Sequence, residues 1–136
     1  MGIVMKLKVF ALLLSLCSCF VNAEPTGSDL LAECTMALNV IDNEDVPDFG
    51  ITSATNSGIC FGRLSAFRDM NWMYSVSLTP EQLLYCVPYT AQVPQLIRVV
   101  VKYLKDNPDK LHIYSNQLVF QALYKAFPCD ADNQKS

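Results

Sequence analysis

The chain has only one histidine, His112, and this scarcity limits the chemistry it can perform. A cysteine–histidine nucleophile pair needs a reduced thiol and a third group that orients the histidine. The sequence also contains no glycine-rich phosphate loop, no G-x-S-x-G motif and no pair of carboxylates in an apolar setting. We therefore expect no catalytic residue, no cofactor and no metal site. For His112 we expect a local hydrogen-bonding or packing role.

Positive charge is also in deficit. The chain carries 10 lysines and arginines against 13 aspartates and glutamates, which gives a formal net charge of −3. An acidic surface argues against nucleic acid or an anionic membrane as the partner. It is compatible with a cationic protein partner.

Long apolar runs are confined to the N-terminus. Two lysines are the only charges in residues 1–23, an apolar run covers Val9–Phe20, and Val21-Asn22-Ala23 resembles a cleavage site. The run is too short for a membrane span. We predict a secretory signal at 1–23 and a single domain at 24–136, whose net charge is −5 because both lysines leave with the signal. The competing interpretation is a lipobox in which Cys19 is acylated and tethers the protein to a membrane.

Four cysteines remain after removal of the signal: Cys34, Cys60, Cys86 and Cys129. An even number in an oxidising compartment predicts two disulfides, with three possible connectivities. Zinc is the rival use of four cysteines, but their spacing includes no C-x-x-C knuckle.

Apolar residues recur at helical spacing in four stretches, and strand signals are weak. We predict an all-α fold of four main helices and one short helix. The main helices are expected from Ser28 as N-cap to Ile41, from a cap at Thr55, Asn56 or Ser57 to Tyr74, from Val93 to Asn107, and from Ser115 as N-cap to Ala126. The short helix is expected after Thr79, where Pro80 and Gln82 complete a capping box.

Several motifs together resemble the Rap/Tai family of immunity proteins, which act against peptidoglycan amidases delivered by bacterial type VI secretion. The resemblance is dense over residues 86–129 and sparser but collinear from Cys34 to Asp69. It is carried by Cys60-Phe61-Gly62, Cys86-Val87-Pro88, Gln95-Leu96, Val99–Leu104, Asn107-Pro108, Lys110-Leu111-His112, Ala122-Leu123 and Ala126-Phe127-Pro128-Cys129. The chain departs from the family pattern at Arg63 and Ala66, where an aromatic residue and a second small glycine would be expected.

The resemblance implies a periplasmic, all-helical, non-enzymatic protein that is usually a homodimer. It would bind a Cys–His amidase and block its active-site cleft, which protects the producing cell and its siblings. We expect the disulfides to pair Cys34 with Cys60 and Cys86 with Cys129, because each would join elements that run side by side.

Partner contacts are expected in exposed segments outside the scaffold. The first candidate joins the second main helix to the Thr79 cap, and the second is an acidic loop. The candidate contact residues are Asp69, Asn71, Trp72 and Tyr74 within 69–77, and Asp42, Glu44 and Asp45 within 42–48. A large aromatic such as Trp72 is either the edge of a core or an interface anchor.

Two other functions remain open at this point. A periplasmic acid-stress chaperone is also small, helical and disulfide-bonded. A secreted enzyme would need a free cysteine.

Overall fold

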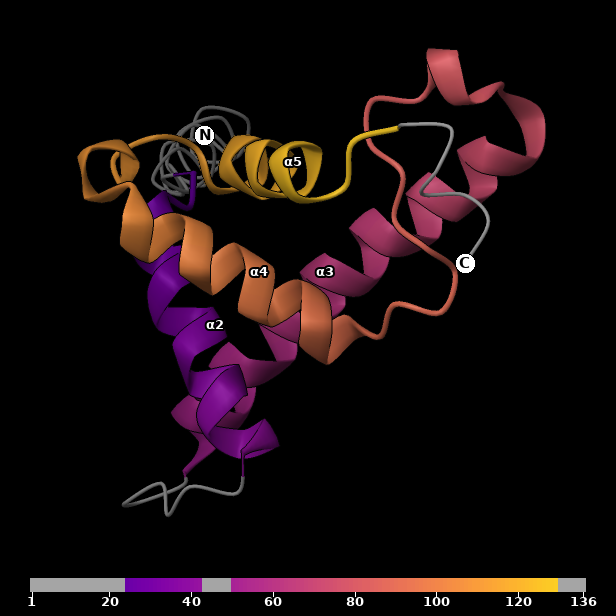
Figure 1. Cartoon of the computed structure of the whole chain (residues 1–136). Coiled ribbons are helices and arrows are strands. Elements are labelled where there is room, and N and C mark those ends of the chain that lie inside the picture. The colour runs from indigo at the N-terminus through magenta and orange to yellow at the C-terminus, as the bar shows by residue number, and fades with distance from the viewer. Residues whose placement is uncertain (1–23, 43–49, 130–136) are drawn as a thin grey trace, which may run out of the picture.

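The computed structural model describes residues 24–42 and 50–129, which form an all-helical domain (Figure 1). The predicted signal at 1–23, with Cys19, and the loop residues Glu44 and Asp45 lie outside the described residues. The elements are α2 (Gly27–Ile41), α3 (Ile51–Ser77), η1 (Pro80–Gln82), α4 (Val93–Asp106), η2 (Pro108–Lys110) and α5 (Ser115–Ala126). Four main helices and a short one after Thr79 are confirmed, the short one being a single 3-10 turn. In the described ranges, no helix is both long and apolar enough to cross a bilayer.

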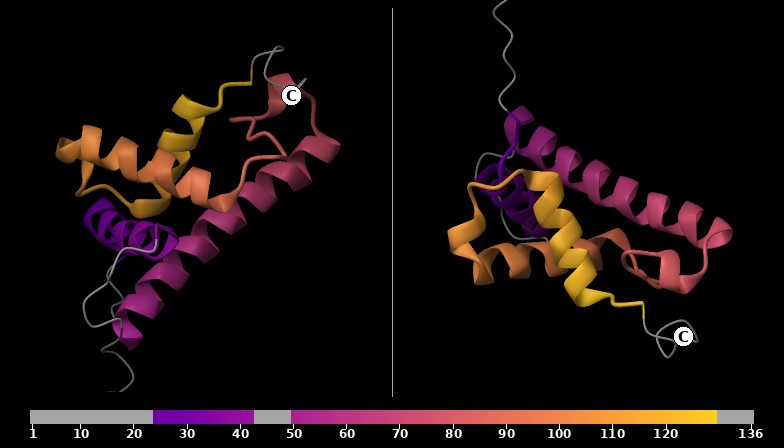
Figure 2. Two further views of the ribbon diagram at one scale, coloured as in Figure 1. Left: turned by 60° about the horizontal axis from the view of Figure 1, so that its bottom comes forward. Right: turned by 90° about the horizontal axis from the view of Figure 1, so that it is seen from above.

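The hydrophobic core lies where the four α-helices meet (Figure 2). The apolar face predicted for α4 is the one that is buried, apart from the half-buried Tyr103. The large apolar side chains that are almost completely buried are Leu30, Leu64, Leu96, Ile97, Val100, Leu104, Leu118, Val119 and Leu123. Burial of these side chains is the main source of the fold's stability.

Helix α2 begins two residues earlier than an N-cap at Ser28 would place it, so that part of the prediction was wrong. The N-cap is Thr26, whose backbone N–H and hydroxyl both donate to the Asp29 carboxylate, at 2.7 and 2.8 Å. The next two amides donate to carbonyls of the 111–113 segment rather than to a side-chain cap. The first turn of α2 is therefore attached to the segment that leads into α5.

Helix α3 extends further in both directions than predicted. Its N-cap is Gly50, and the hydroxyls of Thr55 and Ser57 donate to the carbonyls of Ile51 and Ser53, four residues back. Serine and threonine can make such bonds inside a helix, so neither of these residues acts as a cap. At the other end, no proline or glycine follows Gly62 until Pro80, and the helix continues to Ser77.

Helix α5 also begins differently from the prediction. Tyr114 is the N-cap, and Ser115 is the first helical residue. The Ser115 hydroxyl is fully buried and accepts a hydrogen bond from Arg63 Nη1 at 2.6 Å. Ser115 therefore serves a contact between helices rather than a cap.

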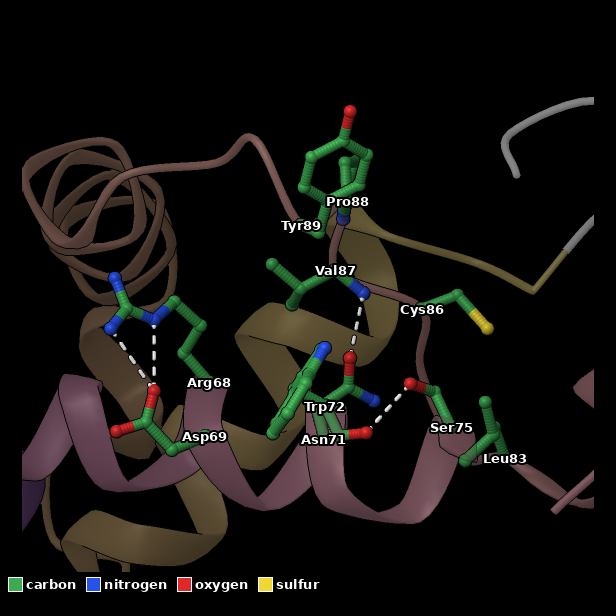
Figure 3. A pocket seen from close by; sticks show the side chains of 10 residues that line it. All are labelled: Arg68, Asp69, Asn71, Trp72, Ser75, Leu83, Cys86, Val87, Pro88 and Tyr89. Atoms are coloured by element: carbon green, nitrogen blue, oxygen red, sulfur yellow. Dashed lines mark hydrogen bonds and ion pairs between the residues drawn. The ribbon is translucent and has the colours of Figure 1, made fainter. Parts of the chain in front are cut away.

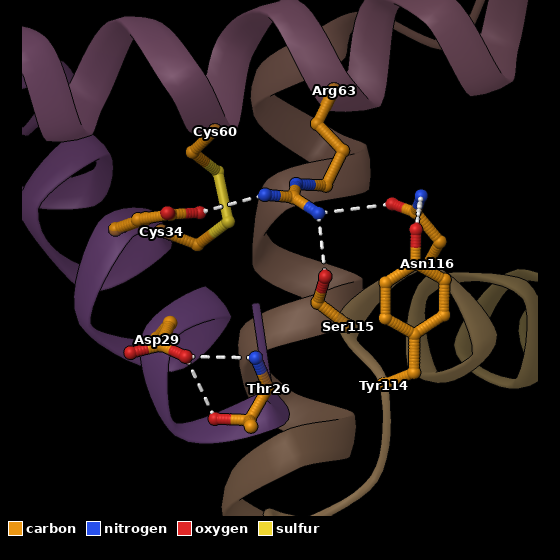
Figure 4. A network of polar contacts seen from close by, with 9 residues as sticks. Thr26, Asp29, Cys34, Cys60, Arg63, Tyr114, Ser115 and Asn116 are labelled. Carbon is orange, nitrogen blue, oxygen red and sulfur yellow. Dashed lines mark hydrogen bonds and ion pairs between the residues drawn. A yellow bond between two sulfur atoms is a disulfide. The ribbon is translucent and has the colours of Figure 1, made fainter. Parts of the chain in front are cut away.

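Arg63 joins three helices at the position where the chain departs from the family pattern. One nitrogen of its guanidinium donates to Ser115 and to Asn116 Oδ1, and the other lies 3.3 Å from Glu33 Oε2 (Figure 4). Both charged side chains are only about one seventh exposed. The packing between α2, α3 and α5 is thus polar here, where the family pattern predicts an aromatic contact.

The predicted disulfide pairing is confirmed. Cys34 and Cys60 join α2 to α3, and Cys86 and Cys129 join the α3–α4 connection to the segment after α5. A disulfide that closes a loop of this length stabilises a fold by about 3–4 kcal/mol in the chain-entropy description.

Candidate functional site

The C-terminal half of α3 extends beyond the bundle formed by the other helices (Figures 1 and 2). There it contacts mainly the connection that returns to α4. We call this end of α3 and the connection, residues 68–92, the lobe. The large apolar residues of the lobe that remain exposed are Met70, Trp72, Met73, Tyr74, Val76, Leu78, Leu84 and Tyr89. The C-terminal half of α3 therefore carries large apolar side chains that the rest of the fold leaves exposed.

Exposure of this kind is unusual in a protein that acts alone. Soluble monomers rarely leave so many large apolar side chains exposed in one region, and clusters of them mark interaction sites. The lobe is accordingly the candidate functional site.

Two grooves flank the extended part of the connection. The first groove has a volume of about 690 Å³ and is lined by Arg68, Asp69, Asn71, Trp72, Ser75, Leu83, Cys86, Val87, Pro88 and Tyr89 (Figure 3). The second groove, of about 330 Å³, is lined by Phe67, Met70, Asn71, Tyr74, Leu78, Gln82, Leu83, Leu84, Tyr85 and Phe120. The first groove includes an ion pair, and the second is lined by uncharged residues.

Asn71 separates the two grooves and holds the connection against α3. Its side-chain nitrogen donates to the carbonyl of Tyr85 at 2.5 Å, and its oxygen accepts from the amide of Val87 at 3.0 Å. Only 6% of Asn71 is exposed. Sequence reasoning included Asn71 among exposed partner contacts, whereas the structure places it beneath the connection as a scaffold residue.

Tyr85 fixes the same segment from the other side. Its hydroxyl donates to the Phe67 carbonyl at 3.0 Å, and its ring packs edge-on against Phe120. Burial raises the pKa of the Tyr85 hydroxyl to about 12, so this donor keeps its proton across the physiological range.

Trp72 and Asp69 lie in the first groove, one helical turn apart. The indole of Trp72 is 61% exposed, and the Asp69 carboxylate accepts two hydrogen bonds from Arg68, at 3.1 and 3.0 Å (Figure 3). Tyr74 lines the second groove instead. The structure therefore brings Trp72 and Asp69 together and places Tyr74 on a different surface.

The other predicted contact residues belong to the acidic loop. Asp42 is the C-cap of α2 and accepts a hydrogen bond from Arg98 at 2.5 Å. Its side chain is 45% exposed. Glu44 and Asp45 lie outside the described residues, so the structure does not test the acidic loop as a contact.

Sequence reasoning missed Tyr89 and Leu84. Tyr89 is 80% exposed and belongs to the wall opposite Trp72, while Leu84 is 65% exposed beside the second groove. One signal could have indicated Tyr89: an aromatic residue next to Pro88, in a segment that no helical pattern accounts for.

Nothing in the described part of the chain resembles a catalytic centre. Both pairs of domain cysteines are bonded as disulfides, which removes the free thiol that a cysteine enzyme would need. His112 is exposed at the corner between α4 and α5. Within residues 24–42 and 50–129, no group of three or more acidic, cysteine or histidine side chains could hold a metal ion.

Comparison with known proteins identifies the family. A family model described as Rap1a immunity proteins matches residues 26–129, which is most of the chain. Comparisons with curated proteins and with solved structures find no match. The match includes both disulfides and every described helix, and it favours immunity over the acid-chaperone and cysteine-enzyme alternatives. Proteins of this family are not enzymes, and a match to it implies immunity to a type VI secretion amidase effector. The chain therefore belongs to the Rap1a family of immunity proteins.

Proposed function

We propose that the protein binds a peptidoglycan amidase effector in the periplasm and blocks its active-site cleft with the lobe. The observation that carries this proposal is the position of Trp72. A large aromatic side chain stands 61% exposed in a groove of about 690 Å³, on a helix end that extends beyond the bundle. A helix end that projects in this way can enter a cleft that a flat surface cannot.

The surroundings of Trp72 suit an interface anchor. Interfaces are dominated by a few aromatic or arginine residues, surrounded by a rim of polar groups. Arg68 and Asp69 provide charged groups on one side of the indole, and Tyr89 provides a second aromatic ring. An inhibitor of this kind occupies the cleft without presenting a bond that the amidase can cut.

Trp72→Ala tests the proposal. We expect binding to the cognate amidase to weaken by about 30-fold or more, because truncating an anchor residue typically costs 2 kcal/mol or more. Isothermal titration calorimetry and a peptidoglycan-cleavage assay would measure affinity and inhibition. Unchanged circular dichroism would show that the variant is folded.

Tyr124→Ala is the matched control. Tyr124 is an aromatic residue of similar exposure, 58%, on α5 and outside the first groove. We expect it to bind the amidase with unchanged affinity. Equal affinities for wild type, Trp72→Ala and Tyr124→Ala would remove the first groove from the interface.

The second groove supports a proposal about oligomeric state. The family resemblance predicts a homodimer, and the uncharged second groove is a surface that a second copy could cover. Tyr74→Glu would place a charge there, and we expect it to shift the protein from dimer to monomer in sedimentation experiments. A wild type that sediments as a monomer at all concentrations would contradict the dimer.

Export through the N-terminal signal completes the proposal. Two disulfides require an oxidising compartment, and the periplasm provides one. N-terminal sequencing of the protein recovered from periplasm would test cleavage after Ala23. Recovery of an acylated Cys19 would instead establish the membrane-tethered alternative.

A further inference from the structure

The wall of the first groove is a segment with little structure of its own. Between η1 and α4, residues 83–92 form no helix or strand. Contacts that hold this segment include the two hydrogen bonds of Asn71, the Tyr85 hydroxyl donating to Phe67, the Cys86 amide donating to Phe127 at 2.9 Å, and the burial of Tyr85 and Ala91 in the core. To these is added one covalent link, the disulfide from Cys86 to Cys129.

The two disulfides differ in burial and in what they join. Cys34 and Cys60 are both completely buried between α2 and α3, within the core. Cys86 is 9% exposed, and Cys129 is half-buried after the end of α5. Thiol–disulfide exchange requires access to a sulfur atom, so a reductant in solution reaches the Cys86–Cys129 bond first.

We propose that the Cys86–Cys129 disulfide is a redox latch on the first groove. While the disulfide is intact, Val87, Pro88 and Tyr89 are held opposite Trp72 and the groove is formed. When the disulfide is reduced, the four-helix bundle persists and the wall of the groove moves away from α3 for part of the time. The effect on amidase binding rests on the proposed function, whereas the opening of the groove does not.

The reaction is an exchange with a dithiol. A thiolate of the reductant attacks one sulfur of the Cys86–Cys129 bond, forms a mixed disulfide and releases the other cysteine as a thiolate. The second thiol of the reductant then displaces the remaining cysteine and closes its own disulfide. The protein gains two electrons and two protons, and the dithiol loses the same. Exchange with the disulfide form of a periplasmic dithiol reverses the change: that disulfide is reduced to two thiols as the Cys86–Cys129 bond re-forms.

The physical reason for opening lies in the stretch between the two buried ends of the segment. Tyr85 and Ala91 belong to the core, whereas Val87 and Pro88 are half-buried and Tyr89 is exposed. A segment with few buried apolar contacts opens locally with a low free energy, independently of global unfolding. A disulfide limits such opening by restricting the open conformations of the chain. A chain in which only the Cys34–Cys60 disulfide has formed would therefore have its bundle without a stable groove. It becomes competent to bind only after oxidation.

Differential alkylation is the first test. The wild-type protein would be treated with increasing dithiothreitol, alkylated, and analysed by peptide mass spectrometry. We expect Cys86 and Cys129 to be labelled at reductant concentrations that leave Cys34 and Cys60 bonded. Labelling of all four cysteines together, or of Cys34 and Cys60 first, would overturn the proposal.

Hydrogen exchange shows whether the groove opens. The Val87 amide is bonded to Asn71, and we expect its exchange to accelerate about tenfold or more in the Cys86→Ser/Cys129→Ser variant. Amides in the middle of α4 should change far less. Trp72 is the only tryptophan, so its indole signal in nuclear magnetic resonance reports directly on the groove. Unchanged Val87 exchange together with an unchanged indole signal would refute the latch.

Measurements of amidase binding distinguish failure of the latch from failure of the proposed function. If reduction leaves the groove formed for about a tenth of the time, the affinity for the amidase falls about tenfold. If the oxidised wild type binds no amidase, the proposed function fails, and the alkylation and exchange results still decide the latch. If the Cys86→Ser/Cys129→Ser variant binds as tightly as wild type, the latch does not regulate this site.

Discussion

Replacing Arg63 with methionine should destabilise the protein more than any other single change to a charged residue in the described part of the chain. The guanidinium donates to three side chains on two other helices, Glu33, Ser115 and Asn116. Methionine fills part of the space but donates nothing. The Glu33 carboxylate would then remain largely buried without its cation.

The magnitude follows from burial. Side chains of the pair are 14% and 13% exposed, so solvent screens their interaction only weakly. Removing one partner of a buried pair costs about 3–5 kcal/mol, and this pair has some contact with water. We therefore expect about 3 kcal/mol for Arg63→Met. That loss lowers the midpoint of thermal unfolding by roughly 12 °C or more.

Removing the acid should cost much less. Burial raises the pKa of Glu33 above its ordinary value, although the charge of Arg63 opposes the shift. The folded protein therefore disfavours ionised Glu33 relative to the unfolded chain. Glu33→Gln keeps the shape without the charge, and we expect it to cost less than about 1 kcal/mol.

Unfolding in guanidinium chloride, followed by circular dichroism, measures the loss of unfolding free energy in both variants. Arg68→Met is the control, because Arg68 is another α3 arginine whose pair with Asp69 is more exposed, and such pairs contribute about 0–1 kcal/mol. The reasoning fails if Arg63→Met costs no more than Arg68→Met. It also fails if Glu33→Gln costs as much as Arg63→Met, because burial would then not be the dominant effect.

Three further predictions concern other parts of the fold. Because the pKa of Glu33 is raised in the folded protein, wild type has extra stability below pH 4.5 and loses it as the pH rises through the folded pKa. Glu33→Gln has no such group, so its stability relative to wild type should fall from pH 7 to pH 4 in unfolding titrations. Gly27→Ala should cost about 1–3 kcal/mol in thermal unfolding, because a Cβ there would collide with the Leu118 side chain and lie 3.0 Å from the backbone of Leu111. Asn71→Ala should cost about 2–3 kcal/mol and accelerate amide exchange in residues 85–87, because two buried backbone groups lose their partner.

Each of these predictions has an outcome that contradicts it. A relative gain in the stability of Glu33→Gln toward acid would mean that the ion pair outweighs burial. An unchanged unfolding midpoint for Gly27→Ala would show that the contact between α2 and α5 can relax. If the amides of residues 85–87 stayed protected from exchange in Asn71→Ala, other contacts would be holding the connection against α3.

Local patterns in the sequence were sufficient for most of the scaffold. The apolar faces of α4 and α5 are fixed by residues three and four apart, and the corner between them is marked by Asn107-Pro108. The pairing of the cysteines was expected on the view that each bridge would join elements lying side by side, and the structure has both bridges. Helix starts were predicted less well, because a serine or threonine at a helix N-terminus resembles one that bonds back to a carbonyl inside the helix.

The candidate site was only partly visible in the sequence. Trp72 and Asp69 were identified because an aromatic residue and an acid stand near the end of a helical pattern. Asn71 lies between the same residues in sequence, yet it is buried by a segment that returns from residues 85–87. Nothing in the local pattern distinguishes a polar residue that faces solvent from one that is covered by a segment returning from later in the chain.

The sequence alone determined that this is an acidic, disulfide-bonded, all-helical chain, because composition and helical spacing depend only on neighbouring residues. Its family resemblance likewise depends on motifs in order. Only the tertiary structure decided that α3 extends past the bundle, that Trp72 and Tyr74 face different grooves, and that Arg63 joins three helices. These features depend on contacts between residues 14 to 53 positions apart. The free energy of such contacts is decided by what the whole fold leaves buried or exposed.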